Sequence, residues 1–335
     1  MSRPAITRAQ WLHGYMDVLR DTGASLEREL RRSGLPTWIE DMPDAYVSVR
    51  LAFDWMARSS RDMSPSEVAF LTARRQSLAT FSSAVRDALL NASTGIARLR
   101  VAMKTATSED SSLSTRAWRE SDCIRLVWET QRYDGGAGFH IAEWVNQQAV
   151  VDCMRSIAGP GFCPVEMTFA SSAVPCSAAL DSFGNTRMLV GQPHTSMLVR
   201  STDLERPCFQ RIQTAVDPVV INWEFNFVST LKNVIRPYLC DGHPSIGQVA
   251  EIVGMSARTL QRRLQKSGLS YSSLLSEVRV DQASTLLSDS SIRIIDISVA
   301  LGFGDQQNFS RSFKQATGMT PSQYRRYIAT GSQSE

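Results

Sequence analysis

Two groups of polar and basic side chains in the C-terminal third carry the donors and acceptors needed to contact nucleic acid. The first group is Arg258, Gln261 and Arg262, and the second is Gln306, Gln307, Asn308 and Arg311. In a DNA major groove, arginine pairs with guanine and asparagine or glutamine with adenine, at about 1–3 kcal/mol of discrimination each. Composition alone is equally consistent with an ordinary solvated surface, so the interpretation depends on the elements that position these side chains.

Residues 245–327 contain the same arrangement twice. Each half predicts a short amphipathic helix, a glycine followed by an apolar residue, and a second helix that presents the polar groups. The glycines, Gly254 and Gly302, supply the left-handed turn, and Met255 and Phe303 fill the angle between the helices. At an offset of 49 residues, the second helices match: Leu260 with Phe309, Arg262 with Arg311, and Leu264 with Phe313. The repetition predicts two tandem helix-turn-helix units.

Residues 270–287 predict one linker helix between the two units. Its core side carries Leu274, Val278, Ala283, Leu286 and Leu287. Such a helix would hold the two second helices at a fixed separation, about one DNA turn of ~34 Å if they enter successive major grooves. Arg279 on this helix is interpreted as a structural ion-pair partner rather than a DNA contact.

At these residues the chain resembles the DNA-binding domain of the AraC/XylS family of bacterial transcription regulators. The resemblance rests on GMSARTLQRRL, on Arg279, Ala283, Leu286 and Leu287, and on GFGDQQNFSRSFKQATGMTPSQYRR. In the family, the third and sixth helices of this domain enter the major groove. The resemblance therefore implies DNA contacts by Arg258, Gln261 and Arg262 from one helix, and by Gln306, Gln307, Asn308 and Arg311 from the other.

The N-terminal part resembles the regulatory domain of the ornithine-utilisation-regulator branch, which is called arabinose-binding-like by analogy. The stretches SLERELRRSGLP and 182–207 carry this resemblance. It implies effector sensing, dimerisation, or both. The fold class expected is therefore an α+β N-terminal regulatory domain, followed by an all-α domain with two tandem helix-turn-helix units joined by a linker helix.

Charge and composition support a division of the 335 residues into two domains. The net charge is +3; residues 228–335 carry 12 Lys and Arg against 8 Asp and Glu, giving +4, and the remainder carries −1. A basic C-terminal third suits a polyanion-binding module. We expect an effector-sensing or dimerisation domain over 1–207, a linker over 208–228, the DNA-binding domain over 229–330, and a polar tail over 331–335.

Within the first domain, helical spacing covers residues 1–60 and 64–90, and Ser64 with Glu67 predicts a capping box. After residue 96 the pattern shifts toward that of strands. A helix over 141–157 interrupts the strands, which are expected at 97–103, 123–128, 164–170, 187–190 and 196–200. Strands after helices, with another helix between them, favour an α+β domain.

No pattern of cofactor, metal or catalytic residues emerges. Six cysteines without a C-x-x-C pair favour reduced, buried thiols in a cytosol, and no apolar segment predicts a signal or membrane span. The chain lacks a G-x-S-x-G elbow, an H-E-x-x-H helix and a phosphate-binding glycine loop, and its four histidines lie far apart. We therefore expect a cytoplasmic protein that is not an enzyme, with no cofactor and no metal.

The function expected is that of a sequence-specific transcription regulator, in the first place an activator. Its expected partners are double-stranded promoter DNA, RNA polymerase, a small-molecule effector and a second copy of the chain. One alternative is an effector sensor that acts mainly by protein–protein contact, with DNA binding secondary. Another is a protein that merely organises DNA, although two base-reading faces and a large attached domain favour regulated binding.

Overall fold

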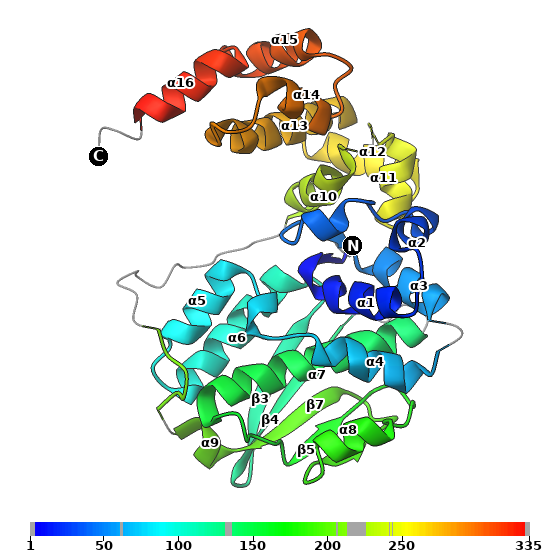
Figure 1. Cartoon of the computed structure of the whole chain (residues 1–335), viewed down its shortest axis with the longest axis vertical. Coiled ribbons are helices and arrows are strands. Elements are labelled where there is room, and N and C mark those ends of the chain that lie inside the picture. Colours follow the sequence, from blue (N-terminus) through cyan, green and yellow to red (C-terminus); the bar gives the residue numbers. More distant parts are fainter. Residues whose placement is uncertain are drawn as a thin grey trace. The chain divides into compact units, whose positions relative to one another are not determined.

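The computed structural model describes residues 4–60, 63–130, 136–205, 207–212, 226–240, 242 and 244–331. Described residues of Ala5–Leu35 and Val47–Glu224 form one compact unit, and those of Met1–Pro4, Pro36–Tyr46 and Phe225–Glu335 form another (Figure 1). We call these the N-terminal and C-terminal units. The first is α+β and the second is helical, which confirms the fold class expected from the sequence. Residues 213–225 of the expected linker, with Trp223, and 332–335 of the expected tail lie outside the described residues.

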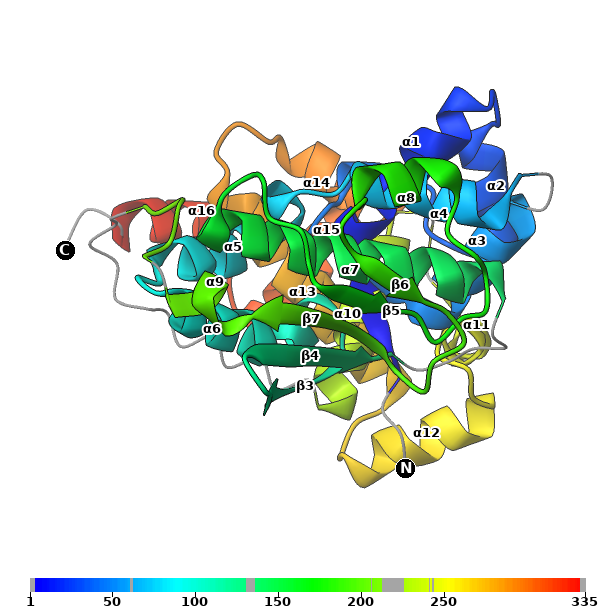
Figure 2. The ribbon, with the colours of Figure 1, turned by 90° about the horizontal axis from the view of Figure 1, so that it is seen from below.

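A five-stranded sheet forms one layer of the N-terminal unit. Its strands are β3 (Ser114–Glu120), β4 (Cys123–Glu129), β5 (Glu166–Thr168), β6 (Arg187–Leu189) and β7 (Thr195–Arg200). They lie in the order β3-β4-β7-β5-β6, with β3 and β6 at the two edges (Figure 2). The pairs are antiparallel except β5 with β6, which is parallel. A separate two-stranded sheet joins β1 (Ile6–Arg8) to β2 (Tyr46–Ser48).

Helices cover one face of this sheet, and α7 is the central one. The helices are α1 (Gln10–Asp21), α2 (Leu26–Ser33), α3 (Val49–Ser59), α4 (Pro65–Arg74), α5 (Ser83–Asn91), α6 (Gly95–Glu109), α7 (Ala137–Ala158), α8 (Ser177–Ser182) and α9 (Ser201–Glu205). Trp144 of α7 is buried, and its ring lies 5.4 Å from that of Phe70 on α4 and 4.8 Å from that of Phe169 beyond β5. One aromatic group thus joins a neighbouring helix and the sheet to α7.

Buried polar groups fix α7 against the strands. The Glu143 carboxylate accepts hydrogen bonds from the Thr195 hydroxyl at 2.5 Å, from the Ala170 N–H at 2.7 Å and from the Ser171 N–H at 3.1 Å. Gln147, one turn later, donates to the carbonyls of Thr168 at 2.9 Å and Ser196 at 3.2 Å. Since a buried polar group without a partner is costly, these bonds specify how α7 lies on the sheet.

The strands at 123–128, 164–170, 187–190 and 196–200 are confirmed, because β4, β5, β6 and β7 lie there, and the helix at 141–157 lies within α7. The strand predicted at 97–103 is wrong. It lies within α6, whose first turn is capped by the Thr94 hydroxyl, which accepts from the Ala97 N–H at 3.2 Å. The predicted capping box is also wrong, because Ser64 precedes α4 but makes no side-chain capping bond. The sequence analysis did not identify β3.

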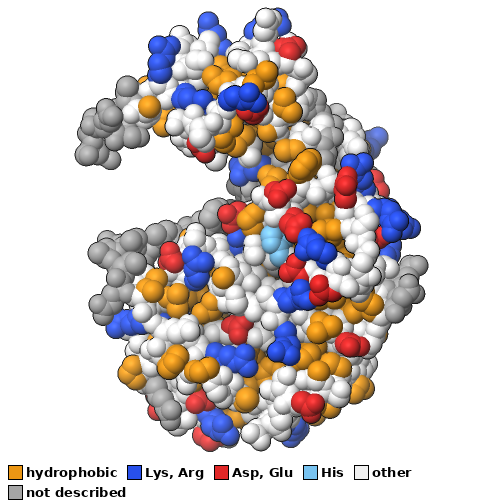
Figure 3. Space-filling view, in the orientation of Figure 1, with side chains coloured by type: hydrophobic (Ala, Val, Ile, Leu, Met, Phe, Trp, Pro, Cys, Tyr) orange, Lys and Arg blue, Asp and Glu red, His pale blue; other side chains and the backbone are white. Residues whose placement is uncertain are grey.

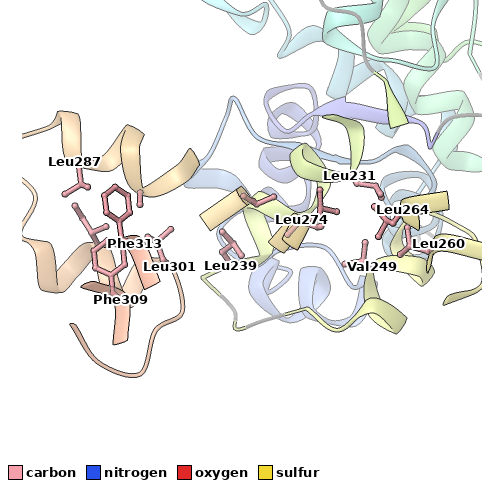
Figure 4. Packing of buried hydrophobic residues seen from close by; sticks show 14 of the residues in the cluster. Leu231, Leu239, Val249, Leu260, Leu264, Leu274, Leu287, Leu301, Phe309 and Phe313 are labelled. Carbon is pink, nitrogen blue, oxygen red and sulfur yellow. The ribbon is translucent and has the colours of Figure 1, made fainter. Parts of the chain in front are cut away.

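The C-terminal unit is built around one apolar core. It contains α10 (Phe227–Ile235), α11 (Ile246–Ile252), α12 (Ala257–Lys266), α13 (Tyr271–Ser288), α14 (Ile294–Ala300), α15 (Gln306–Thr317) and α16 (Pro321–Gly331). Figure 4 shows Val249, Leu260 and Leu264 at one end of this core and Leu301, Phe309 and Phe313 at the other. Buried residues of α13 reach both ends: Leu274 lies toward the first group and Leu287 toward the second. The linker helix α13 therefore contributes to the core of both helix-turn-helix units.

No disulfide joins the six cysteines, all of which are among the described residues: Cys123 and Cys153 are buried, Cys163, Cys176 and Cys208 are partly buried, and Cys240 is exposed. The expectation of buried thiols holds for the first two and is wrong for Cys240, whose Sγ lies 3.1 Å from the Ala300 carbonyl oxygen. Among the described residues, no helix combines the length and apolar character needed to cross a membrane.

Candidate nucleic-acid interface

The two turns that orient the candidate reading helices have the same backbone geometry. Gly254 and Gly302 adopt φ of +67° and +72°, a region that glycine occupies without steric cost. In the first turn, the Gly254 N–H donates to the Glu251 carbonyl at 3.0 Å and the Met255 N–H to the Ala250 carbonyl at 2.9 Å. In the second, the bonds Gly302 to Val299 and Phe303 to Ser298 are each 2.9 Å. Both pairs of bonds form a Schellman motif, which ends the first helix of each unit.

The second helices also begin alike. The Ser256 hydroxyl accepts from the Thr259 N–H at 3.2 Å at the start of α12, and the Asp305 carboxylate accepts from the Asn308 N–H at 2.7 Å at the start of α15. These caps are 49 residues apart, the offset that relates Leu260 to Phe309 and Leu264 to Phe313, all four buried. Because the cap and the buried stripe both repeat, the outward faces of α12 and α15 consist of equivalent positions.

On α12 the predicted residues Arg258, Gln261 and Arg262 are all exposed. Arg258 and Arg262 are four residues apart on the side opposite Leu260 and Leu264, so they lie one above the other on a single face. Gln261 lies at the flank of this face. The neighbouring Arg263 is different, because it is partly buried and its guanidinium lies 5.3 Å from the ring centre of Phe227. Arg263 therefore stabilises the unit, and Arg258 and Arg262 point to solvent.

On α15 the predicted residues Gln306, Gln307, Asn308 and Arg311 are all exposed, and two of them are linked. Arg311 Nη2 donates to Asn308 Oδ1 at 2.9 Å, and Asn308 Nδ2 donates to Asp305 Oδ2 at 2.7 Å. Gln307 and Arg311 lie on the outward face, whereas Gln306 precedes Phe309 by three residues and lies above the buried stripe, at the helix start. The structure thus brings Asn308 and Arg311 together and leaves Gln306 apart from them.

Applying the offset of 49 to the whole face adds Gln265, Lys314 and Gln315, whereas Lys266 was already expected on the outward face from the sequence. Gln265 of α12 corresponds to Lys314 of α15, and Lys266 corresponds to Gln315; all four are exposed. Gln265 and Lys314 continue the line of Arg262 and Arg311 by about one turn, since residues three and four apart share a helix face. The repeat used to identify the helix-turn-helix units would have revealed these positions if it had been applied to every outward residue and not to Arg262 and Arg311 alone.

The charge on these helices is of one sign. Residues 257–266 contain Arg258, Arg262, Arg263 and Lys266, and residues 306–317 contain Arg311 and Lys314, with no Asp or Glu in either segment. Figure 3 shows several Lys and Arg side chains over the α14–α16 part of the C-terminal unit. A surface of this kind attracts a polyanion, because no carboxylate on the helix opposes the phosphates.

Arg279 of the linker helix α13 contacts an aromatic ring and not the carboxylate expected from the sequence. Its guanidinium lies 5.3 Å from the ring centre of Phe303, the residue that fills the second turn. Burial lowers the pKa of Arg279, and no carboxylate lies within ion-pair distance of it in the part of the chain that the structure describes. The ion-pair interpretation is therefore wrong: Arg279 braces the turn through a cation–π contact.

Similarity to known proteins agrees with this geometry. Residues 249–327 match a family model described as a helix-turn-helix domain. The transcriptional regulator VirS of Mycobacterium tuberculosis is 26% identical over 338 residues, covering 98% of each chain. The ornithine utilization regulator of Pseudomonas aeruginosa is 37% identical over 82 residues, or 24% of each chain. The arabinose operon regulatory protein of Salmonella typhimurium is 38% identical over 92 residues, or 27% of this chain and 33% of that one.

The tandem helix-turn-helix units and the similarity to these regulators lead to one conclusion. The N-terminal α+β unit and the helical C-terminal unit together have the organisation expected of a regulator with an attached control domain. Residues 249–327 form a helix-turn-helix DNA-binding domain like that of the AraC-type regulators, and over almost its whole length the chain is similar to a transcription regulator.

Proposed function

We propose that α12 and α15 enter major grooves of promoter DNA and read its sequence. The residues assigned to base edges are Arg258, Gln261, Arg262, Gln306, Gln307, Asn308 and Arg311, with Gln265 and Lys314 extending the two faces. One observation supports this proposal above the others. Arg262 and Arg311 are exposed at equivalent positions of two helices that lack carboxylates and that follow identical turns.

The proposal extends to control by the N-terminal unit. A small-molecule effector, or dimerisation through this unit, changes the affinity of α12 and α15 for DNA, and the bound homodimer activates transcription by recruiting RNA polymerase. In support, the described residues of 5–35 and 47–224 form a compact unit with its own apolar core. An effector can act in this way only if its affinity differs between the arrangements of the protein that do and do not engage the promoter.

The second candidate is a sensor that acts mainly by protein contact, with DNA binding secondary. Both second helices are capped, at Ser256 and Asp305, and both turn glycines have φ above zero. The frame that presents the outward residues is therefore intact in both helix-turn-helix units, which favours DNA binding over this alternative. A third candidate, a protein that organises DNA without reading it, predicts no preference between DNA sequences.

The test begins with the selection of high-affinity duplexes from a random pool by the full chain, since phosphate contacts alone enrich no sequence. Arg262→Ala and Arg311→Ala are then compared with the parent chain on the selected duplex and on random DNA at a stated salt concentration. Each variant should lose about 1–3 kcal/mol on the selected duplex and much less on random DNA. Arg293→Ala is the matched control, because Arg293 is exposed but already pairs with Asp296 at 2.6 Å.

Equal losses on both DNAs would show that these arginines contact only phosphate and would contradict base reading. Failure to select any sequence would favour the organising protein or the protein-contact sensor. Control by the N-terminal unit is tested separately, by transcription in vitro with RNA polymerase from a promoter that carries the selected sequence. If no substitution in the N-terminal unit alters operator affinity or transcript yield, that part of the proposal fails.

A further inference from the structure

Strand β3 forms one edge of the five-stranded sheet, and its outer side has no backbone partner in the part of the chain that the structure describes (Figure 2). Its seven residues pair with β4 in an unbroken antiparallel register, and the segment contains no proline, glycine or bulge. The opposite edge, β6, has only three residues. An open strand edge is a template for pairing with another chain, and proteins usually keep such edges short, bent or covered. The edge at which a further strand can add is therefore β3.

The backbone groups of Thr115, Ala117 and Arg119 point away from β4. The Ser201 N–H donates to the carbonyl of Asp122, just before β4, at 2.9 Å, so the even-numbered residues of β4 bond toward β7. The odd-numbered residues of β4 bond toward β3, where their partners are the even-numbered residues. The three odd-numbered residues of β3 make no other backbone hydrogen bond within the described ranges. Their N–H and C=O groups form the open edge.

On the face of the sheet away from the helices, β3 presents Arg116, Trp118 and Glu120. The Thr115 hydroxyl donates to the Met103 carbonyl of α6 at 3.3 Å, so Thr115 faces the helices. Because successive side chains of a strand point to opposite faces, the even-numbered ones face the other way. Trp118 is 44% exposed. An indole left in solvent at a strand edge is typical of a protein–protein interface, where tryptophan is enriched.

The two charges that flank Trp118 have partners on β4 and remain accessible. Arg116 lies 2.6 Å from Glu129, and Glu120 lies 2.6 Å from Arg125. The side chains of Arg116 and Glu120 are 57% and 45% exposed. A guanidinium has five N–H donors and a carboxylate about four acceptor sites, so each group has capacity for a second, opposite charge.

The row of Arg116, Trp118 and Glu120 is its own complement in an antiparallel pair. If two copies of β3 pair about Trp118, the two indoles lie opposite each other, and each Arg116 lies opposite Glu120 of the partner subunit. In this alignment the outward backbone groups of Ala117 meet those of Arg119 of the partner subunit. The indoles then occupy a non-hydrogen-bonded pair, where Cα atoms are only ~4.5 Å apart. The nearest alternatives that keep the backbone bonds place Arg119 opposite itself, or Arg116 opposite Trp118, so they oppose like charges or lose the ion pairs.

We propose that β3 pairs with β3 of a second copy of the chain, antiparallel and centred on Trp118, and joins the two sheets across a twofold axis. The pairing rests on the proposed dimerisation through the N-terminal unit and names its surface. Charges on a strand edge usually deter association. Here they select the alignment, because Glu129, Arg116, Glu120 of the partner subunit and Arg125 of the partner subunit alternate in sign. A strand of another protein would need the same pattern, which a second copy supplies by symmetry.

Sedimentation of the full chain without DNA, over a series of concentrations, tests the pairing. Arg116→Glu and Glu120→Arg should each be monomeric at concentrations where the parent chain is a dimer, because each places two pairs of like charges across the interface. An equal mixture of the two variants should form a heterodimer, since every charge at the interface then faces its opposite. Mixing repairs an interface but cannot repair damage inside a subunit. Arg187→Glu at the other edge is the matched control, because it breaks an exposed ion pair with Glu166 and should leave the dimer intact.

A backbone substitution tests the same edge without changing charge. Ala117→Pro removes an N–H that β4 does not use, a position at which an edge strand tolerates proline. It should weaken the dimer about 25-fold, because two hydrogen bonds are lost and each contributes about fivefold. Ala117→Ser keeps the N–H and should behave as the parent chain does. These two variants decide the question if either charge reversal prevents folding.

The pairing is overturned if the folded charge variants do not associate on mixing, or if the dimer survives both charge reversals or Ala117→Pro. A parent chain that is monomeric at every concentration, yet selects specific DNA, also overturns it and leaves the reading of DNA by α12 and α15 standing. A dimer that responds as expected in a chain that selects no DNA supports the pairing and contradicts the proposed function instead.

Discussion

Arg311 Nη2 donates a hydrogen bond to Asn308 Oδ1 at 2.9 Å, and Asn308 in turn donates to Asp305 at 2.7 Å. The Asp305 cap is thus linked through the Asn308 amide to the Arg311 guanidinium. These bonds hold the guanidinium in place in the absence of DNA. In the first unit, the equivalent hydroxyls of Ser256 and Thr259 are 2.9 Å apart. No hydrogen bond to the side chain of Arg262 occurs there among the described residues. The two helix-turn-helix units therefore share a frame and differ in how firmly the arginine that we propose to read bases is held.

Asn308→Ala should weaken binding to the selected DNA mainly through Arg311. Alanine keeps the backbone N–H that Asp305 caps, so the helix start is preserved while the arginine loses its acceptor. We expect a loss of about 1 kcal/mol, and a double-mutant cycle with Arg311→Ala should give a coupling of at least ~0.5 kcal/mol. The measurement is a titration of labelled duplex by the four proteins.

Additive losses in that cycle would contradict the positioning of Arg311 by Asn308 and would leave Asn308 only its own contact with the DNA. The matched control is the pair Thr259→Ala and Arg262→Ala in the first helix-turn-helix unit. Thr259 and Arg262 occupy the positions equivalent to Asn308 and Arg311, but the Thr259 hydroxyl lies against Ser256 and not against the arginine. That pair should be additive within about 0.3–0.5 kcal/mol.

Gly302→Ala should destabilise the C-terminal unit by about 1–2 kcal/mol. Its φ of +72° forces an added Cβ into a conformation that L-residues rarely adopt. Gly304→Ala is the control, since Gly304 is exposed and a Cβ there meets nothing within 4 Å. Urea unfolding followed by circular dichroism measures both variants, and equal stability of the two would contradict a strict requirement for glycine at the turn.

The C-terminal unit could be predicted in detail because its determinants are local. A cap, a periodic apolar stripe and a turn glycine lie within 25 residues of one another, and the repeat tested each assignment against a second copy. The N-terminal sheet was harder to predict. Strand β3 pairs only with β4 and has six exposed residues of seven, so its sequence lacks the alternation that marks a half-buried strand.

Tertiary partners explain the remaining differences. Residues 97–103 have strand-like composition, yet Arg98 is fully buried at 0% exposure because acceptors from distant segments surround it. Arg279 stacks on Phe303, 24 residues along the chain, where the sequence suggested only a carboxylate. The link between Asn308 and Arg311 is local in sequence but depends on rotamers, so residue types alone could not reveal it.

Arg98→Met should destabilise the N-terminal unit by about 3 kcal/mol. The Arg98 guanidinium donates to the carbonyls of Ser156 at 2.8 Å, Ala92 at 3.2 Å and Gln210 at 2.6 Å, and methionine leaves these acceptors without a donor. Arg100→Met on the same helix is the control, because Arg100 is exposed and its replacement should change stability by less than ~0.5 kcal/mol. Thermal unfolding of both variants distinguishes them, and similar melting temperatures would contradict the prediction.

Asp110 should make the stability of the N-terminal unit fall as the pH rises from about 4 to 7. Burial raises the pKa of Asp110 from 3.8 to about 6, against the opposing hydrogen bonds from Ser112. Between those two values the folded state binds more protons than the unfolded state, so unfolding becomes easier with increasing pH.

Asp110→Asn keeps an acceptor for Ser112 and does not titrate. The free energy of unfolding of the wild type minus that of this variant should therefore decrease by up to about 3 kcal/mol over the interval, because one pKa unit corresponds to about 1.4 kcal/mol. Urea titrations of both proteins at several pH values measure the difference, in which other titrating groups cancel, and a flat difference would show that the carboxyl ionises as easily in the folded chain as in the unfolded one.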